Sequence, residues 1–326
     1  MFGAENPEFV TEVQVDQMKL LKKILVGLAS LMLLLSIAAW LGFVHWVGDV
    51  VALFVPYLAG GTAVFLLVFA SLRHRTGVVL AGSALLLNLI PLIGYLPLAR
   101  LAAASQPADL RLMVYNLYFQ NSDLDAVLAE VEAHDPDVIF LMEYSFATQA
   151  QIEAEFADYP YRLIEPSRMT SGLALFSRVP ITASDLYRFD ATHIPIFEAT
   201  FDVAGEAVTL VGGHPWPPID RWAGLHAAQV ADVQRVAVQV EGPLIVAGDF
   251  NAAPWSYALR QLQQAAGVQD ARRGFGGLTT WFGPPLVHLS LDHVFASDEL
   301  AVQNYQHGQP GGSDHLPIVV DFSVVP

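Results

Sequence analysis

The chain has 326 residues, of which 54% are hydrophobic, a formal net charge of −16 and no cysteine. The lack of cysteine excludes a disulfide scaffold and thiol chemistry. From residue 101 onward there are 10 Arg, no Lys and 27 acidic residues, a balance that weighs against a protein holding an extended nucleic acid on a basic surface.

Three apolar runs without a single charge occupy the first hundred residues, at 24–46, 50–72 and 76–98. Each run of about 23 residues makes a helix of about 35 Å, which is enough to cross a bilayer core of about 30 Å. We therefore predict an N-terminal segment (residues 1–23) followed by three transmembrane helices (24–98). A cleavable signal peptide would explain only the first run, which is too long for one.

Basic residues predict how these helices are oriented. Three lysines lie within residues 19–23 and two arginines within 73–75, whereas the loop between the first two runs has neither. The positive-inside rule then places the N-terminus in the cytoplasm and everything after residue 98 outside the cytoplasmic (inner) membrane of a bacterium, on the periplasmic side. Residues 99–109 are predicted to be a linker, and its Ala-x-Ala pattern is also compatible with a processing site that releases the domain.

The remainder, residues 110–326, has the pattern of a single α/β domain. Helical periodicity marks residues 122–133, with Ser122 as the expected N-cap, and also 224–240 and 256–266. Strand-like runs lie at 110–115, 138–142, 173–177, 197–203, 208–211, 244–247, 294–296 and 318–322. Because long helices separate only some of these strands, we predict two mixed sheets packed face to face with helices outside, a four-layer α/β/β/α sandwich.

Polar side chains cluster where these strands end. They are Asn116, Glu143, His214, Asp249, Asn251, Asp292, His293, Asp314 and His315. Taken singly, each has a structural explanation, such as a solvated strand end, an Asx turn or a strand cap. Together they indicate a site on loops held by a rigid sheet. Carboxylate and amide oxygens are the ligands that Mg²⁺ or Mn²⁺ prefers, and the histidines lack zinc-motif spacing. A metal held by carboxylates beside histidines suits phosphoester cleavage.

Six segments carry a resemblance to one known family. They are V-Y-N (114–116), F-L-M-E (140–143), G-G-H-P (212–215), G-D-F-N-A-A-P (248–254), L-D-H-V-F (291–295) and G-S-D-H-L-P-I (312–318). In this order the segments resemble the endonuclease/exonuclease/phosphatase family, and the likeness extends over about residues 110–322.

The resemblance implies a role for each matching residue. Asn116 and Glu143 would hold the metal, and Asp314 would complete the metal region. His214 would contact the scissile phosphate, with Asn251 steadying it. Asp249 would orient or deprotonate the attacking water, and His315 would face the phosphate, held in place by Asp292. His293 is expected to be structural, since its counterpart in the family is often another residue.

One motif departs from the family pattern, because His214 is followed by Pro-Trp-Pro-Pro (215–218). This rigid loop is expected to shape a distinct substrate pocket, in which Trp216 and Trp222 either touch the substrate or serve as packing residues. The sequence thus predicts a membrane-anchored extracytoplasmic Mg²⁺-dependent phosphoesterase acting on a lipid headgroup or a small phosphorylated metabolite. The alternatives are an extracytoplasmic nuclease and a catalytically inactive interaction module on the same fold.

Overall fold

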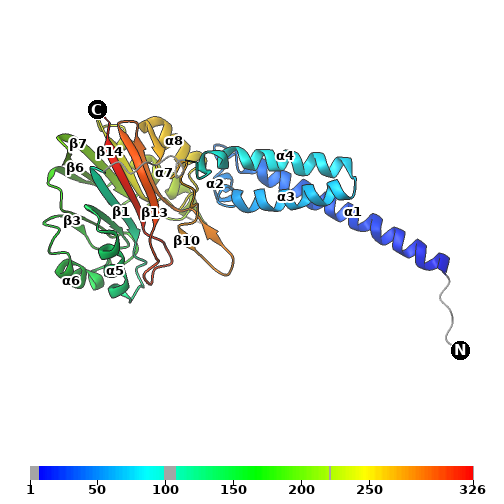
Figure 1. Ribbon diagram of the computed structural model, residues 1–326, viewed down its shortest axis with the longest axis horizontal. Coiled ribbons are helices and arrows are strands. Elements are labelled where there is room, and N and C mark those ends of the chain that lie inside the picture. The colour runs from blue at the N-terminus through cyan, green and yellow to red at the C-terminus, as the bar shows by residue number, and fades with distance from the viewer. Residues whose placement is uncertain (1–6, 99–107, 220–221, 326) are drawn as a thin grey trace.

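The computed structural model describes residues 7–98, 108–219 and 222–325, with side chains from Asp16 onward. The first residues of the N-terminal segment and residues 99–107 of the predicted linker, with their processing pattern, lie outside the described residues. An elongated helical region projects from a globular α/β part (Figure 1).

The helical region is formed by α1 (Pro7–Ala38), α2 (Val47–Ala52), α3 (Val55–Ser71) and α4 (Arg75–Leu92), which continues into a short 3-10 turn at Ile93–Tyr95. Two helical stretches are long and apolar enough to cross a membrane, Asp16–Ala38 with 23 residues and Arg75–Tyr95 with 21. Inside the bundle, the buried Asn88 amide donates to Ser36 Oγ at 2.9 Å, so this polar pair joins α4 to α1.

The predicted helix over residues 50–72 is wrong, because the chain breaks between α2 and α3. Pro56 lies in the first turn of α3, where its missing N–H costs no helical hydrogen bond. The resulting α3 has 17 residues, a length of about 26 Å, which is shorter than a bilayer core of about 30 Å. Among the described residues there are therefore two candidate spans, where the sequence predicted three. The first predicted run also ends early, since α1 stops at Ala38.

The globular part contains two mixed six-stranded sheets, as predicted, and a separate two-stranded ribbon. The first sheet has the order β13-β14-β1-β2-β4-β3, and only β1 and β2 pair in parallel. Its strands are β1 (Leu110–Asn116), β2 (Val138–Met142), β3 (Tyr161–Glu165), β4 (Leu173–Ser177), β13 (Leu300–His307) and β14 (Ile318–Val324).

The second sheet has the order β5-β6-β7-β8-β12-β9, and only β7 and β8 pair in parallel. Its strands are β5 (Ile181–Tyr187), β6 (Ile196–Val203), β7 (Glu206–Gly213), β8 (Leu244–Asp249), β9 (Val268–Asp270) and β12 (Asp292–Ser297). The ribbon consists of β10 (Trp281–Phe282) and β11 (His288–Leu289), and it lies beside the helical region in Figure 1.

Alternate side chains of the two sheets meet in one core cluster, including Val114 and Phe140 from the first sheet and Phe197 and Ala247 from the second. The opposite faces pack against helices. Those over the first sheet are α5 (Leu124–His134) and α6 (Phe146–Glu155), and those over the second are α7 (Ala223–Ala237) and α8 (Tyr257–Ala266).

The N-cap of α5 differs from the prediction. Asp123, and not Ser122, caps the helix by accepting a hydrogen bond from Ala126 N, because its carboxylate reaches the exposed N–H groups of the first turn. Helix α6 was not predicted; it begins with a capping box formed by Ser145 and Thr148.

The helical region is docked onto the globular part through polar and apolar contacts. The buried Asp49 carboxylate accepts hydrogen bonds from Tyr257 N at 2.5 Å and Ala258 N at 3.4 Å, in the first turn of α8. Trp255 Nε1 donates to Ala52 O at 2.7 Å, and both residues belong to a buried cluster. The contacts therefore connect the start of α8 directly to the α2–α3 segment.

Candidate active site

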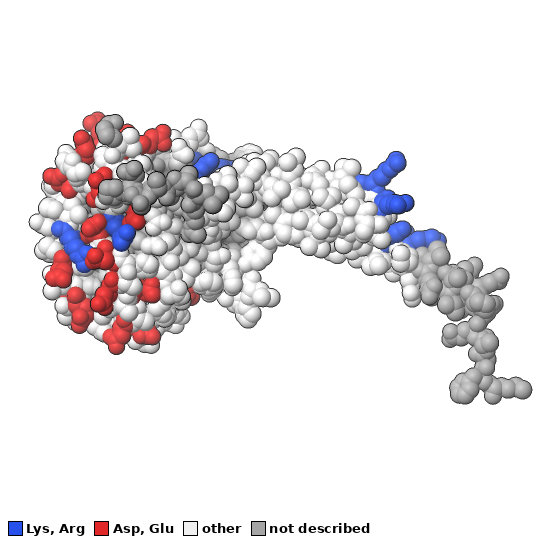
Figure 2. Space-filling model, viewed as in Figure 1, with Lys and Arg blue, Asp and Glu red and all other residues white. Residues whose placement is uncertain are grey.

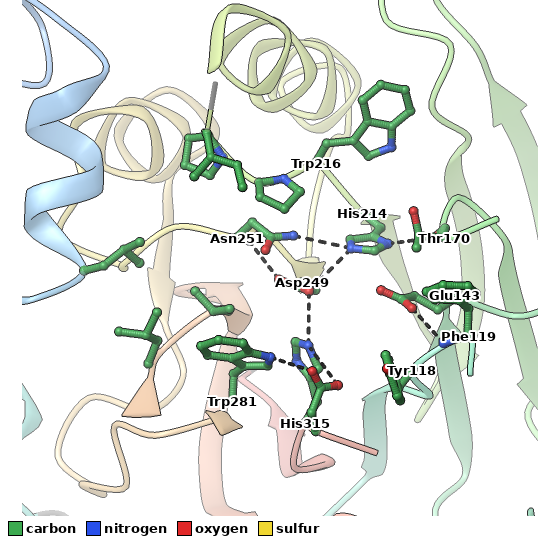
Figure 3. A pocket seen from close by; sticks show the side chains of 17 residues that line it. Tyr118, Phe119, Glu143, Thr170, His214, Trp216, Asp249, Asn251, Trp281 and His315 are labelled. Atoms are coloured by element: carbon green, nitrogen blue, oxygen red, sulfur yellow. Dashed lines mark hydrogen bonds and ion pairs between the residues drawn. The ribbon is translucent and has the colours of Figure 1, made fainter. Parts of the chain in front are cut away.

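A cavity of about 370 Å³ opens where the central strands of both sheets end. Asn116 is the last residue of β1, Asp249 the last of β8 and Asp292 the first of β12, while Glu143 and His214 directly follow β2 and β7. Of the predicted site residues, seven line the cavity: Glu143, His214, Trp216, Asp249, Asn251, Asp314 and His315. The structure thus brings the predicted set together from distant segments of the chain (Figure 3).

Asp249 lies at the centre of the polar network. Its Oδ2 accepts a hydrogen bond from Asn116 Nδ2 at 3.0 Å, and its Oδ1 accepts one from Asn251 N at 2.8 Å. The same Oδ2 is 3.4 Å from His214 Nε2 and 3.7 Å from His315 Nε2, as Figure 3 shows. Burial alone would raise the pKa of Asp249, but the two imidazoles hold this pKa well below its usual range. The Asp249 side chain is therefore ionised at neutral pH.

Each of the two histidines is fixed at its other ring nitrogen. His315 Nδ1 bonds Asp292 Oδ2 at 2.8 Å, and His214 Nδ1 donates to Thr170 O at 3.0 Å. Burial opposes protonation of His315, but the nearby Asp292 charge and hydrogen bond raise its pKa to about 10. Burial likewise opposes protonation of His214, but the hydrogen bond to Asp249 raises its pKa. The surroundings of both histidines thus favour the protonated imidazole, which suits an anionic ligand in the cavity.

Carboxylate oxygens of Glu143 and Asp314 also line this cavity. Glu143 accepts hydrogen bonds from Phe119 N at 2.8 Å and Asn116 Nδ2 at 3.3 Å. Asp314 Oδ2 accepts one from Trp281 Nε1 at 2.8 Å, whereas its buried Oδ1 has no hydrogen-bond partner in the described part of the chain and lies 3.9 Å from His315 Nε2. Glu143 has a φ of 56°, in the left-handed region that L residues rarely adopt. Such strain is typical of functional positions.

A second group with metal-binding side chains consists of Asp249, Asp292 and His315, whose ligand atoms lie within 4.8 Å of one another. Both ring nitrogens of His315 already face carboxylates, at 2.8 Å from Asp292 and 3.7 Å from Asp249. His315 is thus held by one hydrogen bond to Asp292 and one ion-pair contact with Asp249, so we consider Glu143 and Asp314 to be the better ligands for a hard cation.

His293 points away from the cavity, although it adjoins Asp292 in the sequence. Its Nε2 bonds Ala252 O at 2.7 Å, and its Nδ1 lies 2.6 Å from Arg272 Nη2. Burial and the Arg272 charge lower the pKa of His293 to about 4. Arg272 itself is fully buried and also donates to Asp292 O at 3.1 Å. His293 therefore links the strand that begins at Asp292 to the loop that follows Asp249, and Arg272 holds that strand from the other side.

Sequence reasoning missed several residues of the site. Thr170, Tyr118 and Trp281 line the cavity, as does Leu53 from the helical region. None follows a long strand-like run, so no pattern marked them. For Trp216, the ring packs edge-on against Trp222 with centroids 4.7 Å apart, and its backbone N donates to Gln229 Oε1 at 2.7 Å.

Comparison with known proteins adds a family and several relatives. The model of the Endonuclease/Exonuclease/phosphatase family matches residues 113–315. The UPF0294 protein of Vibrio campbellii is 30% identical over 103 residues, covering 30% of this chain and 34% of that protein. A UPF0294 protein of Vibrio vulnificus is 36% identical over 101 residues, covering 29% of this chain and 33% of that protein. The match thus spans about a third of the length of these curated relatives.

Solved structures share the fold at low identity. The human Nocturnin catalytic domain with bound sulfate has a TM-score of 0.54 at 20% identity, covering 68% of this chain and 100% of that chain. The 3′ phosphatase NExo from Neisseria, bound to a product DNA hairpin, has a TM-score of 0.54 at 19% identity, covering 66% and 99%. Sphingomyelinase C from Streptomyces griseocarneus has a TM-score of 0.50 at 17% identity, with the same two coverages.

Proposed function

Because the chain belongs to the Endonuclease/Exonuclease/phosphatase family, whose model covers residues 113–315, we propose that it is a metal-dependent phosphoric ester hydrolase. The observation that carries this proposal is the placement of two histidines on either side of Asp249, at 3.4 and 3.7 Å, in a cavity that also contains Glu143 and Asp314. Imidazolium groups and a metal-binding carboxylate pair are what an in-line phosphoryl displacement requires.

The metal is proposed to be Mg²⁺ or Mn²⁺, held by Glu143 and Asp314 with the Asn116 amide. The donor set consists of oxygens, which hard cations prefer, and the buried Asp314 Oδ1 has no hydrogen-bond partner among the described residues. These residues therefore fit such an ion. When bound, the ion would polarise a phosphoryl oxygen and offset negative charge.

The chain's own residues would carry the remaining steps. Asp249, kept ionised by its neighbours, would accept a hydrogen bond from the attacking water and aim it in line; its low pKa makes it a weak base. Asn251 Nδ2 lies 3.4 Å from His214 Nε2, so the two side chains would contact the same phosphate group. His315 would stabilise the charge that develops on the phosphoryl group, and Asp292 would fix its ring.

Membrane anchoring is proposed from the helical region. Apolar side chains point outward along its helices, with Leu34 on α1 and Leu86 on α4 each 63% exposed, which disfavours the core helices of a soluble protein. Figure 2 shows basic side chains at the end of this region away from the globular part, and none along its middle. Since α3, although short, runs beside α4 back to this basic end (Figure 1), the globular part lies at the opposite end of the helices; by the positive-inside rule the basic end is cytoplasmic and the catalytic part is periplasmic.

The favoured substrate is a lipid headgroup or a small phosphorylated metabolite. Among the described residues that line the cavity none is Lys or Arg, and such side chains are what holds a nucleic-acid backbone. An extracytoplasmic nuclease is the alternative, and NExo shares the fold and binds DNA in its solved structure.

The test is a substrate panel with the full chain in detergent micelles. The panel contains an aryl phosphodiester, plasmid DNA, RNA, sphingomyelin, glycerophospholipids and inositol phosphates, each assayed with Mg²⁺, Mn²⁺ or chelator. Activity should need the metal, and Glu143→Gln should require more metal, whereas Glu132→Gln on the exposed side of α5 should behave as wild type. Full activity after exhaustive chelation would refute the metal, and preferential cleavage of DNA would favour the nuclease.

A further inference from the structure

The active-site cavity has two chemically different sides. The polar side carries the histidines, Asp249 and the metal-binding carboxylates. The other side, which we name the apolar wall, consists of Leu53, Pro217, Pro218, Ile219, Leu289 and Leu291. A small hydrophilic phosphate would leave the apolar wall in contact with water, which costs free energy. A substrate with an apolar portion would cover the wall.

The apolar wall includes the departure from the family pattern noted in the sequence. Pro217, Pro218 and Ile219 follow His214 and Trp216 directly, and Ile219 is 54% exposed. Because proline fixes the backbone φ angle, the loop holds this apolar surface rigidly next to the histidine that faces the phosphate. The Pro-Pro-Ile segment thus acts together with the polar site.

Leu53 comes from the helical region and completes the wall. It lies between the end of α2 and the start of α3, and in sequence it precedes every polar residue of the site. In Figure 3, a helix of this region borders the cavity on the side opposite Glu143 and Tyr118.

Hydrogen bonds hold this junction in place on both sides of Leu53. Ala52 O accepts the Trp255 indole at 2.7 Å. The Tyr57 hydroxyl bonds His288 O at 3.0 Å and accepts from His288 N at 2.6 Å, next to Leu289 of the wall. The apolar wall is therefore held in a fixed position by hydrogen bonds, and both the globular part and the helical region contribute residues to it.

From this geometry we infer that the substrate is an amphiphile of the bilayer, a phosphoester whose phosphate lies between His214 and His315 and whose alkyl portion lies along the apolar wall toward the helices. Leu53 is then a specificity-determining residue contributed by the helical region. The inference rests on the proposed function and names its substrate class. Within the part of the chain that the structure describes, the cavity lining contains no Lys or Arg, which favours this class over a polyanion, for which a basic track is needed.

The experiment uses the full chain in detergent micelles and a series of phosphodiesters with one headgroup and alkyl chains of increasing length, together with an aryl phosphodiester. Burying a methylene is worth up to about fourfold in binding. We expect kcat/KM of the wild type to rise with chain length, and Leu53→Ser to lower the ratio of kcat/KM on the longest chain to that on the aryl ester about tenfold. Ile219→Ser should act in the same direction.

The matched control is Leu128→Ser, which removes a half-buried leucine on α5, outside the cavity, and should leave the ratio unchanged. Wild-type activity that is independent of chain length, while the aryl ester is cleaved, would overturn this inference and leave the proposed hydrolase intact. A wild type inactive on every phosphoester would instead refute the proposed function. Faster cleavage of an oligonucleotide than of any alkyl ester would also overturn the inference.

Discussion

Replacing Asp292 by Asn isolates the charge that supports His315. The side chains are nearly isosteric, and the Asn carbonyl oxygen can still accept the hydrogen bond from His315 Nδ1, now 2.8 Å from Asp292 Oδ2. The substitution removes the negative charge. Burial lowers the pKa of His315, and the Asp292 charge is the largest of the effects that outweigh burial and raise this pKa from 6.5 to about 10. That rise corresponds to a preference for the imidazolium of about 5 kcal/mol.

Only part of this preference should vanish, because Asp249 and Asp314 also raise the pKa of His315. Loss of one close opposite charge typically lowers a pKa by about 1–3 units. As the pH rises, His315 should therefore lose its proton about 1–3 pH units earlier in Asp292→Asn than in the wild type. At pH 7.5 we expect kcat to fall about 10- to 100-fold, the usual effect of removing a supporting carboxylate.

The assay is kcat as a function of pH from 6 to 10.5, at saturating metal, on a substrate that the panel identifies. The alkaline limb of the profile should move to lower pH in Asp292→Asn and be absent in His315→Gln, with circular dichroism confirming that both variants fold. An alkaline limb at the same pH in wild type and Asp292→Asn would show that Asp292 does not tune His315, and our account of the pair would be wrong.

Four further predictions follow from the same structure. His315→Ala should lower kcat about 10²–10³-fold with little change in KM, whereas His293→Ala should lose far less activity in the same steady-state assay; equal deficits would place the site on the wrong Asp-His pair. Because the pKa of His293 is lowered to about 4 in the folded state, the unfolded state binds more protons between pH 4 and 6.5. Denaturant titrations should show that the contribution of neutral His293 to the free energy of unfolding is complete above pH 6.5 and falls by about 3 kcal/mol toward pH 4. The fall should be less steep in His293→Gln. Arg272→Met should lower the free energy of unfolding by about 3–5 kcal/mol, because it leaves the buried Asp270 charge without its ion-pair partner. Adding Asp270→Asn should restore part of this loss, whereas additive losses would argue against the pair. Alkaline phosphatase fused after Gln106 should be active, and a reporter that works only in the cytoplasm should be silent there; the reverse would refute the orientation.

The catalytic strand ends were predictable because two signals coincide there. An apolar run such as residues 138–142 becomes a buried strand, and the polar residue that ends it must then lie at the edge of a sheet. Both β2 and β4 have the predicted bounds. The strands that were missed, including β3, β10 and β11, are short or partly exposed, so their side chains show no long apolar run.

Other features depend on contacts that a linear pattern does not contain. Arg272 reads as an ordinary surface charge, yet Asp270, Ser290 and His293 enclose it. The break before α3 was masked because residues on both sides of it are equally apolar, and only Pro56 marks it. Leu53 reaches the active site only because the helical region docks there.

The contacts of Asp49 and Trp255 have a consequence for dissecting this protein. A fragment trimmed to residues 108–326 would be a convenient soluble reagent, but it would lack the carboxylate that satisfies the first N–H groups of α8. It would also present the buried Trp255 indole to water and open the side of the cavity that Leu53 closes. Such a fragment is expected to be less stable and prone to self-association, and its substrate preferences would be those of an incomplete pocket.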